Sequence, residues 1–289
     1  MSVPERPAGA VNDTTRRRAV DGGGGREPAA VRFRATVEYD GTDFAGFQIQ
    51  TNARTVQGEL EAALARLSDG VRSPVDGAGR TDAGVHASGQ VISFTYAGRL
   101  DEAALEAALN GQLPPDVAVR DLRRAPSGFH PRHAARYREY RYTVWNGPRS
   151  PLRERQALWM RAPLDVATME RAGQAFTGRH DFRAFGAVLE DRSPVRTVQA
   201  VRVRRQGSLV TIDVRADAFL RGMVRRMVAV LLEVGLGTMT EQDIREALAD
   251  RNPARNGAAA PARGLCLRRV VVGRSGRVGR QRTETNEER

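Results

Sequence analysis

The sequence predicts an α+β fold that is built in two halves. Two observations support this fold class: runs of strand-like alternation mix with runs of helix-like periodicity, and such a mixed set occurs twice along the chain. Mixed sets of this kind fold as sheets covered by helices. We assign residues 29–128 to an N-terminal half and residues 129–275 to a C-terminal half. No sequence repeat relates the two halves.

The N-terminal half opens with a strand, because apolar and polar residues alternate from Val31 to Tyr39. This alternation indicates one buried face. Apolar residues then recur at helical spacing from Val56 to Leu67, and Thr55 stands where it can cap that helix. The remaining predicted elements are a strand near 71–78, a strand over 90–96, a helix over 101–110 and a strand over 116–124.

The C-terminal half repeats the mixture in another order. Its most strongly patterned helix runs from Phe219 to Val234, and Thr240 is placed to cap a further helix that ends near Ala249. Gln206-Gly207 is typical of a hairpin turn between two strands. The other predicted elements are a strand over 136–146, a helix over 165–176, strands over 198–205 and 209–216, and a closing strand over 265–272.

The two ends of the chain lack such patterns. Residues 1–28 are rich in Gly, Pro, Ala and Arg, and we expect them to be disordered; residues 276–289 are expected to form a flexible tail. The start has no apolar core of the signal-peptide type, and no run is apolar enough to span a bilayer. Cys266 is the only cysteine, which excludes a disulfide within the chain. We expect a soluble, cytoplasmic protein.

Positive charge dominates the composition, with 46 basic against 34 acidic residues and a formal net charge of +12. An anionic partner relieves such self-repulsion, and nucleic acid is the first candidate, ahead of a membrane surface. The chain contains no lysine, so every basic residue is arginine. Chemistry that depends on lysine, such as a Schiff base or a P-loop, is therefore excluded. A basic bias of the whole proteome is the alternative explanation.

One loop concentrates groups that are able to do chemistry. Between two strand-like runs, Gly79 to Ala87 reads GRTDAGVHA and places Arg80, Thr81, Asp82 and His86 close together. Functional groups often lie on loops that rigid strands hold. Asp82 is a candidate nucleophile or base. The alternative is a structural Asx-turn, in which its carboxylate only binds nearby N–H groups.

This loop resembles the signature of the TruA-type tRNA pseudouridine synthases, and four further segments resemble that family's motifs in order over about residues 31–272. They are EYDG with FAGFQ at 38–48, TVQGELE at 55–61, YRY at 140–142 and FLRGMVR at 219–225. The resemblance implies the pseudouridine synthase fold, with two ferredoxin-like halves, joined sheets and a cleft between them. It also implies isomerisation of uridines 38, 39 and 40 in the anticodon stem-loop of tRNA, without a cofactor, by a homodimer.

The resemblance assigns roles to four residues. Asp82 corresponds to the family's essential aspartate and Tyr140 to the tyrosine that stacks on the target base. Arg225 corresponds to the partner of the aspartate, and Arg80 to a position linked with base flipping and RNA contact. Helical periodicity independently places Arg221 and Arg225 along one border of an apolar stripe. A solvated flank for Arg225 and a simple surface role for Arg80 are the alternatives.

Other readings of the residues are weaker. His130 and His133 have a spacing that suits a metal, but no Cys or carboxylate cluster completes a site, so we expect no metal. A catalytically silent tRNA-binding protein and a two-carboxylate glycosidase that uses Asp40 or Asp43 are the rival functions. Arginines on strands and loops would contact phosphates of the stem-loop and the body of tRNA: Arg32, Arg34, Arg120, Arg123, Arg124 and Arg136.

Overall fold

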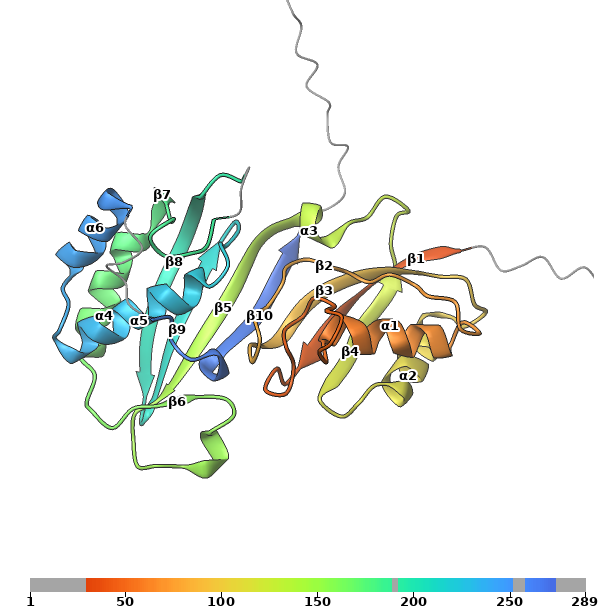
Figure 1. Ribbon diagram of the computed structural model, residues 1–289, viewed down its shortest axis with the longest axis horizontal. Coiled ribbons are helices and arrows are strands. Elements are labelled where there is room, and N and C mark those ends of the chain that lie inside the picture. The colour runs from red at the N-terminus through yellow and green to blue at the C-terminus, as the bar shows by residue number, and fades with distance from the viewer. Residues whose placement is uncertain (1–29, 189–191, 252–257, 274–289) are drawn as a thin grey trace, which may run out of the picture.

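The computed structural model describes residues 30–188, 192–251 and 258–273. The predicted disordered segment 1–28 and the predicted tail 276–289 lie outside the described residues. Within the described ranges, the helices and strands form an elongated molecule with one sheet running through both halves (Figure 1). The division of the chain at residues 128 and 129 remains a prediction.

The sheet contains ten strands within the described residues, in the order β4-β1-β3-β10-β5-β9-β8-β7, with β2 on β3 and β6 on β5. Neighbouring strands are antiparallel except for two parallel pairs, β10 with β3 and β5 with β6. The predicted α+β class with a joined, mixed sheet is thus confirmed. The strands are β1 Val31–Tyr39, β2 Asp76–Gly77, β3 His86–Tyr96, β4 Val117–Arg124, β5 Ala135–Trp145, β6 Leu158–Trp159, β7 Gly178–Asp181, β8 Val195–Gln206, β9 Leu209–Ala216 and β10 Leu265–Val272.

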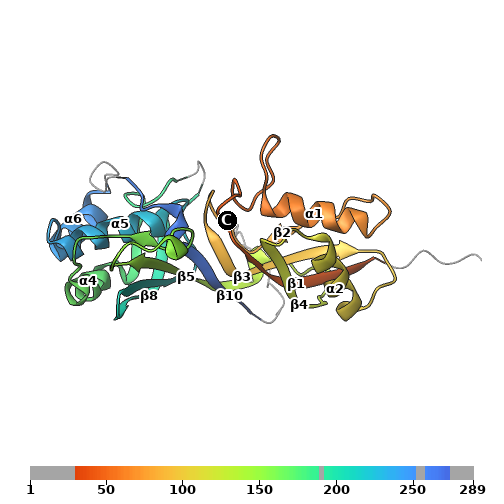
Figure 2. The ribbon, with the colours of Figure 1, turned by 90° about the horizontal axis from the view of Figure 1, so that it is seen from below.

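Two groups of helices pack on this sheet, one in each half (Figure 2). In the N-terminal half these are α1 Val56–Arg66 and α2 Glu102–Gln112, and in the C-terminal half α4 Val166–Gly173, α5 Met223–Leu236 and α6 Glu241–Asp250. The short helix α3 Pro131–Ala134 leads into β5, and single 3₁₀ turns span Pro151–Arg153, Gln174–Phe176 and Ala262–Gly264. Among the described residues, no helix combines the length and apolar character needed to cross a bilayer.

Local sequence explains where the main helices begin and end. Thr55 caps α1 by accepting a hydrogen bond from the backbone N–H of Gly58, and Thr240 forms a capping box with Asp243 at the start of α6. Helix α5 begins after Gly222 and ends before Gly237, and both glycines adopt the left-handed conformation. It therefore starts at Met223, four residues later than the periodicity predicts.

The predicted strand near 71–78 is wrong except for its last part. Only Asp76 and Gly77 pair as a strand. Just before them, the N–H of Val75 donates to the buried carboxylate of Glu61 at 3.1 Å, and Arg72 binds the same carboxylate. Pro74 has no N–H to give to a ladder. The segment 71–75 is therefore held by a side chain of α1 and does not pair with a neighbouring strand.

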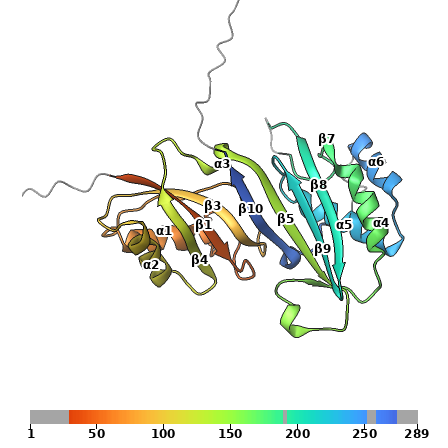
Figure 3. The same cartoon turned by 180° about the vertical axis from the view of Figure 1, so that it is seen from behind.

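The two halves meet where β10, the last strand of the chain, lies between β3 and β5 (Figure 3). It pairs with β5 along its whole length but with β3 only through Cys266 opposite His86 and Leu267 opposite Ala87. His86 directly follows the loop that carries Asp82. The junction of the sheets is therefore also the place where the candidate site is built.

Candidate active site

The signature loop, residues 79–85, is held from one side by the segment 41–47. The N–H of Phe47 donates to the carbonyl of Thr81 at 3.1 Å, and the N–H of Gly84 donates to the carbonyl of Phe44 at 3.2 Å. Gly46 has a φ of +108°, and a Cβ there would lie 2.8 Å from the carbonyl oxygen of Thr81. Two motifs that are separate in the sequence thus pack backbone against backbone, and this contact requires glycine.

Buried side chains hold the loop from its other sides. The hydroxyl groups of Tyr39 and Thr81 lie 2.8 Å apart and are hydrogen-bonded. The amide of Gln90, which is fully buried, donates to the carbonyl of Gly79 at 2.9 Å. Burial raises the pKa of Tyr39 against the opposing effect of its hydrogen bond with Thr81, so this phenol stays protonated. The backbone on both sides of Asp82 is therefore fixed by groups of the N-terminal half.

Asp82 faces two guanidinium groups of the C-terminal half. Its side chain is 29% exposed, with Nη1 of Arg225 at 3.9 Å from Oδ2 and Nε of Arg221 at 3.8 Å from Oδ1. Both distances are longer than hydrogen bonds. In the turn that follows, the N–H of Val85 donates to the backbone carbonyl of Asp82 at 3.1 Å, so this turn does not use the carboxylate. The carboxylate is charge-compensated and open on one side.

The two arginines differ in how they are held. Nε of Arg225 donates to the carbonyl of Ala260 at 2.6 Å, the N–H of Ala260 donates back to the carbonyl of Arg225, and the side chain is 24% exposed. Arg221 is 80% exposed. Arg225 lies on α5 and Arg221 just before it, and the sequence-based assignment selected only Arg225. The periodicity that placed both on one border was the signal for Arg221.

Tyr140 lies on β5 between β10 and β9, opposite Leu267 and Val214. Its side chain is buried, and its ring meets that of Phe219 edge to face with centroids 5.2 Å apart. Burial raises the pKa of Tyr140; the positive charge of Arg138 opposes this shift, and the negative charge of Asp82 adds to it. The phenol is therefore neutral.

Arg80 and Tyr142 occupy contrasting positions. Arg80 is exposed at the edge of the signature loop. Tyr142, two residues after Tyr140, is fully buried, and its hydroxyl donates to the carbonyl of Pro261 at 2.9 Å. Tyr142 is thus a core residue that also holds the segment to which Arg225 is bound.

His86 joins the loop to both halves. Its Nδ1 accepts a hydrogen bond from the N–H of Gly41 at 3.0 Å, so Nε2 carries the hydrogen that faces the carbonyl of Arg263 at 3.1 Å. This network assigns the tautomer. His86 thus orders the start of β3.

Asp40 and Asp43, the carboxylates of the glycosidase alternative, are engaged by Arg155 at 3.3 Å and 2.7 Å. Partial burial raises the pKa of Asp40, but hydrogen bonds from Thr42 and the positive charge of Arg155 oppose this shift, and the pKa is lowered overall. Both groups are therefore occupied in binding a loop of the C-terminal half, residues 146–157.

The remaining candidates lie apart from Asp82. The rings of His130 and His133 have centroids 4.6 Å apart, and Nε2 of His130 lies 3.8 Å from Asp76. Among the arginines expected to contact phosphate, Arg32, Arg120 and Arg124 form ion pairs with Asp76, Glu38 and Glu102. Phosphate contact by that set remains a prediction.

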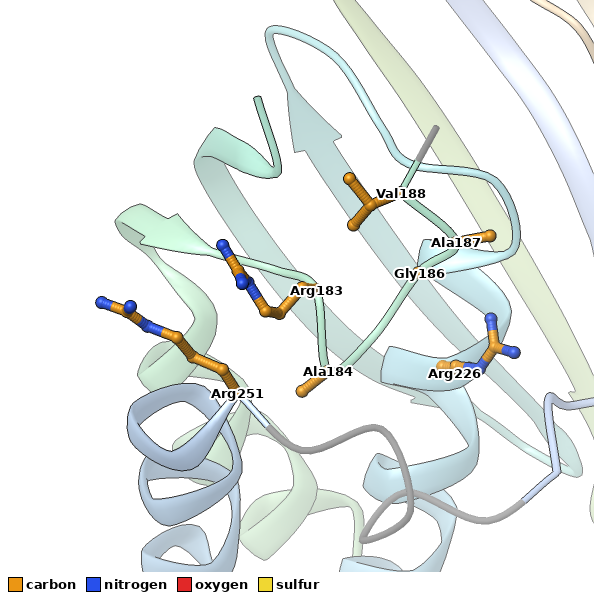
Figure 4. Close-up of a pocket in the computed structure, with 7 residues that line it drawn as sticks. All are labelled: Arg183, Ala184, Gly186, Ala187, Val188, Arg226 and Arg251. Atoms are coloured by element: carbon orange, nitrogen blue, oxygen red, sulfur yellow. The ribbon is translucent and has the colours of Figure 1, made fainter. Parts of the chain in front are cut away.

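A pocket of about 340 Å³ lies elsewhere in the C-terminal half, beside the start of α5 (Figure 4). Arg183 and Arg251, which line it, lie 2.9 Å and 3.8 Å from the carboxylate of Asp181. The other lining residues are Ala184, Gly186, Ala187, Val188 and Arg226. None of the four predicted site residues is among them, so the candidate site is the signature loop and not this hollow.

Comparisons with known proteins agree with the motifs. The family model described as tRNA pseudouridine synthase matches residues 35–133 and 172–271. A tRNA pseudouridine synthase A of Brevibacillus brevis is 42% identical over 244 residues, which cover 83% of this chain and 99% of that protein. Its counterpart in Moorella thermoacetica is 44% identical over 245 residues, covering 82% and 98%. A solved Cbf5-Nop10-Gar1 complex is 13% identical at a TM-score of 0.34, over 81% of this chain and 48% of that chain.

Proposed function

The chain belongs to the tRNA pseudouridine synthase family, and from this premise we propose that it isomerises uridines 38, 39 and 40 in the anticodon stem-loop of tRNA, with the Asp82 carboxylate as the reacting group. Membership of the family supports an isomerase that acts on tRNA uridine. A catalytically silent tRNA-binding protein is not favoured by this membership. The observation that carries the choice of residue is the fixed loop that presents Asp82 to two guanidinium groups.

The reaction moves one bond and conserves every atom. The bond from uracil N1 to ribose C1′ breaks, the base rotates, and a bond forms from C5 to C1′. The hydrogen that leaves C5 is balanced by the one gained at N1. A carboxylate serves this chemistry by attacking C1′ or by removing a proton from the sugar. Either role requires the charged form close to the ribose of an extruded nucleotide.

The groups around Asp82 would support these steps in different ways. Arg225, fixed by Ala260, compensates the carboxylate charge when the substrate excludes water. Stacking of the target base on Tyr140 would return about 1–3 kcal/mol of the cost of unstacking. Arg80, exposed at the edge of the loop, is placed to contact the RNA where the base leaves its stack.

We further propose that the protein is cytoplasmic and acts as a homodimer. A dimer suits an L-shaped tRNA, because one subunit can grip its body while the other acts on the target. Light scattering on the purified protein measures its mass in solution. A mass of one chain, 31.6 kDa, at the concentration of the activity assay would contradict the dimer.

The experiment that tests Asp82 is its replacement by Asn. We expect Asp82→Asn to bind unmodified tRNA with the parent affinity and to form no detectable pseudouridine, because a neutral amide neither attacks carbon nor accepts a proton. Pseudouridine is mapped base by base on the product RNA. Asp101→Asn is the matched control, since Asp101 caps α2 and Asn caps helices equally well. An Asp82→Asn variant as active as the parent would refute the assignment.

A further inference from the structure

Arg138 on β5 holds three main-chain carbonyls that belong to separate segments of the chain. Its Nη2 donates to the carbonyl of Ala78 at 2.6 Å and to the carbonyl of Arg132 at 3.3 Å. Its Nη1 donates to the carbonyl of Asp217 at 2.7 Å. The residue after β2, the helix α3 and the turn after β9 thus meet at one guanidinium group, in the region where α3 leads into β5 (Figure 1).

The bond from Arg138 to Ala78 crosses from the C-terminal half to the N-terminal half. Ala78 is buried and directly precedes the signature loop, and a Cβ on Gly79 would lie 3.7 Å from Nε of Arg138. The next carbonyl, that of Gly79, accepts its hydrogen bond from Gln90 of β3. Two successive carbonyls at the start of the loop are therefore bound from two directions, one by each half of the molecule.

The bond from Arg138 to Asp217 fixes the start of the segment that leads to Arg221. Arg221 follows Asp217 by four residues, and Asp82 likewise follows Ala78 by four. The far ends of the two segments meet, since Nε of Arg221 lies 3.8 Å from Oδ1 of Asp82. Arg138 therefore binds the beginnings of two short segments, one from each half, whose charged side chains face each other in the candidate site.

A guanidinium group suits this position because its nitrogens are fixed in one plane. The two Nη atoms of Arg138 hold the carbonyls of Ala78 and Asp217 at a set separation, which the single nitrogen of a flexible lysine does not reproduce. The pairing of β3 with β10 that joins the two sheets is short. Arg138 adds a link between the halves beside the signature loop, where that pairing alone gives little support.

We propose that Arg138 is a positioning residue of the isomerisation, which sets the separation of the two halves at the site and so holds Asp82 at its working distance from Arg221 and Arg225. Both Nη atoms of Arg138 donate to carbonyls, so it acts through the main chain and not by contact with the RNA. A displacement of about 1 Å in a reacting group can cost about 10²-fold in rate. The proposal rests on the proposed function and adds a residue that acts through Asp82.

The test replaces Arg138 by Gln, which is too short to span the three carbonyls. In single-turnover assays at saturating tRNA, we expect kcat of Arg138→Gln to fall by about 10–10²-fold. The Kd for tRNA should stay within about twofold and the slope of log K against log salt should not change, because no phosphate contact is lost. Assays run at a temperature where circular dichroism shows the variant to be folded separate this fall in kcat from a loss of stability.

Arg138→Lys carries the test if the Gln variant does not fold. It keeps the charge and the apolar stem but has one nitrogen in place of the planar pair, so kcat should still fall by about fivefold or more. The matched control is Arg66→Lys. Arg66 also donates to neutral oxygens, those of the side chain and main chain of Gln112, at 2.9 Å and 2.8 Å, and it joins α1 to the end of α2 without contact with the signature loop. The control should keep the parent kcat.

A double-mutant cycle with Arg225→Gln tests whether Arg138 acts through the surroundings of Asp82. The fall in kcat of Arg138→Gln/Arg225→Gln should be at least about threefold smaller than the product of the two single falls, because both changes disturb the same arrangement of charges. Falls that multiply in full would overturn the proposal, as would an Arg138→Lys variant with the parent kcat. A salt slope shallower by about 0.7–0.9 would also overturn it, because Arg138 would then contact a phosphate. Absence of pseudouridine from the parent protein refutes the proposed function instead, so the two failures are distinguishable.

Discussion

The two halves of the molecule treat Asp82 differently. The N-terminal half carries the residue and fixes the loop around it through hydrogen bonds of 2.8–3.2 Å with Tyr39, Phe44, Phe47 and Gln90. The C-terminal half approaches the carboxylate only with charge, through Arg221 and Arg225 at 3.8–3.9 Å. One half therefore sets the position of the acid, and the other half sets its electrostatic surroundings.

This division depends on a narrow junction. Within the described residues, the sheets of the two halves join through two residue pairs of β3 and β10. The β3 members, His86 and Ala87, directly follow the signature loop. Small shifts at the junction would change the distance from Asp82 to α5 while leaving the loop itself intact. The positioning of the loop and the compensation of the Asp82 charge can therefore be tested by separate substitutions.

The largest effect is expected when a positive charge that faces Asp82 is removed. Arg225→Gln should lower kcat by roughly 10²–10³, the range found when one preorganised electrostatic group of an active site is removed. Arg221→Gln should lower kcat less than about tenfold, because Arg221 is exposed and its charge is screened by water. Single-turnover formation of pseudouridine at saturating tRNA measures both.

Arg225→Lys sharpens this comparison. It keeps the charge but loses the planar group that binds the carbonyl of Ala260. A Lys variant with the full activity of the parent would mean that anchoring by Ala260 is irrelevant. Equal losses in the Gln variants of both arginines would remove the distinction between them.

The next largest effect is expected when a contact that positions the signature loop is disturbed. Gly46→Ala places a Cβ 2.8 Å from the carbonyl oxygen of Thr81 at a φ of +108°, so the loop must move. We expect a loss of about 1–3 kcal/mol in the free energy of unfolding and a fall in kcat of up to about 10²-fold. Denaturant unfolding and the single-turnover assay report the two quantities.

Gly207→Ala is the control for Gly46→Ala. Gly207 has a φ of +57°, and a Cβ there would meet nothing within 4 Å. This variant therefore carries backbone strain without contact with the loop, and it should retain the parent kcat. If both alanine variants lost activity equally, global strain and not the contact with Thr81 would be the cause.

The smallest effect is expected for Tyr39→Phe. This change removes the hydroxyl that binds Thr81 and should cost about 0.5–1.5 kcal/mol in the free energy of unfolding, with a fall in kcat of a few-fold. Tyr137→Phe in the C-terminal half is the control. It removes a hydroxyl from a ring that stacks under Arg215 and should change neither the free energy of unfolding nor kcat. An unchanged Tyr39→Phe variant would show that the remaining contacts suffice to position the loop.

Two independent signals in the sequence indicated Asp82 and Arg225 as candidate site residues. The motif at 79–87 identified Asp82, and the helical periodicity of 219–234 placed Arg221 and Arg225 on one border. It did not indicate that Gln90 and Arg138 bind the carbonyls before Asp82, or that Ala260 holds Arg225. These contacts join main-chain carbonyls to residues far along the chain, and no local pattern marks them.

The sequence by itself determined most of the elements, since alternation and helical spacing reflect which face of each segment is buried. It also determined the family, since motifs in a fixed order are local facts. Only the tertiary structure decided that β10 separates β3 from β5, and that α5 and the segment just before it bring Arg225 and Arg221 to Asp82. The physical reason is that pairing and charge proximity depend on the path of the whole chain, whereas periodicity depends on a few neighbouring residues.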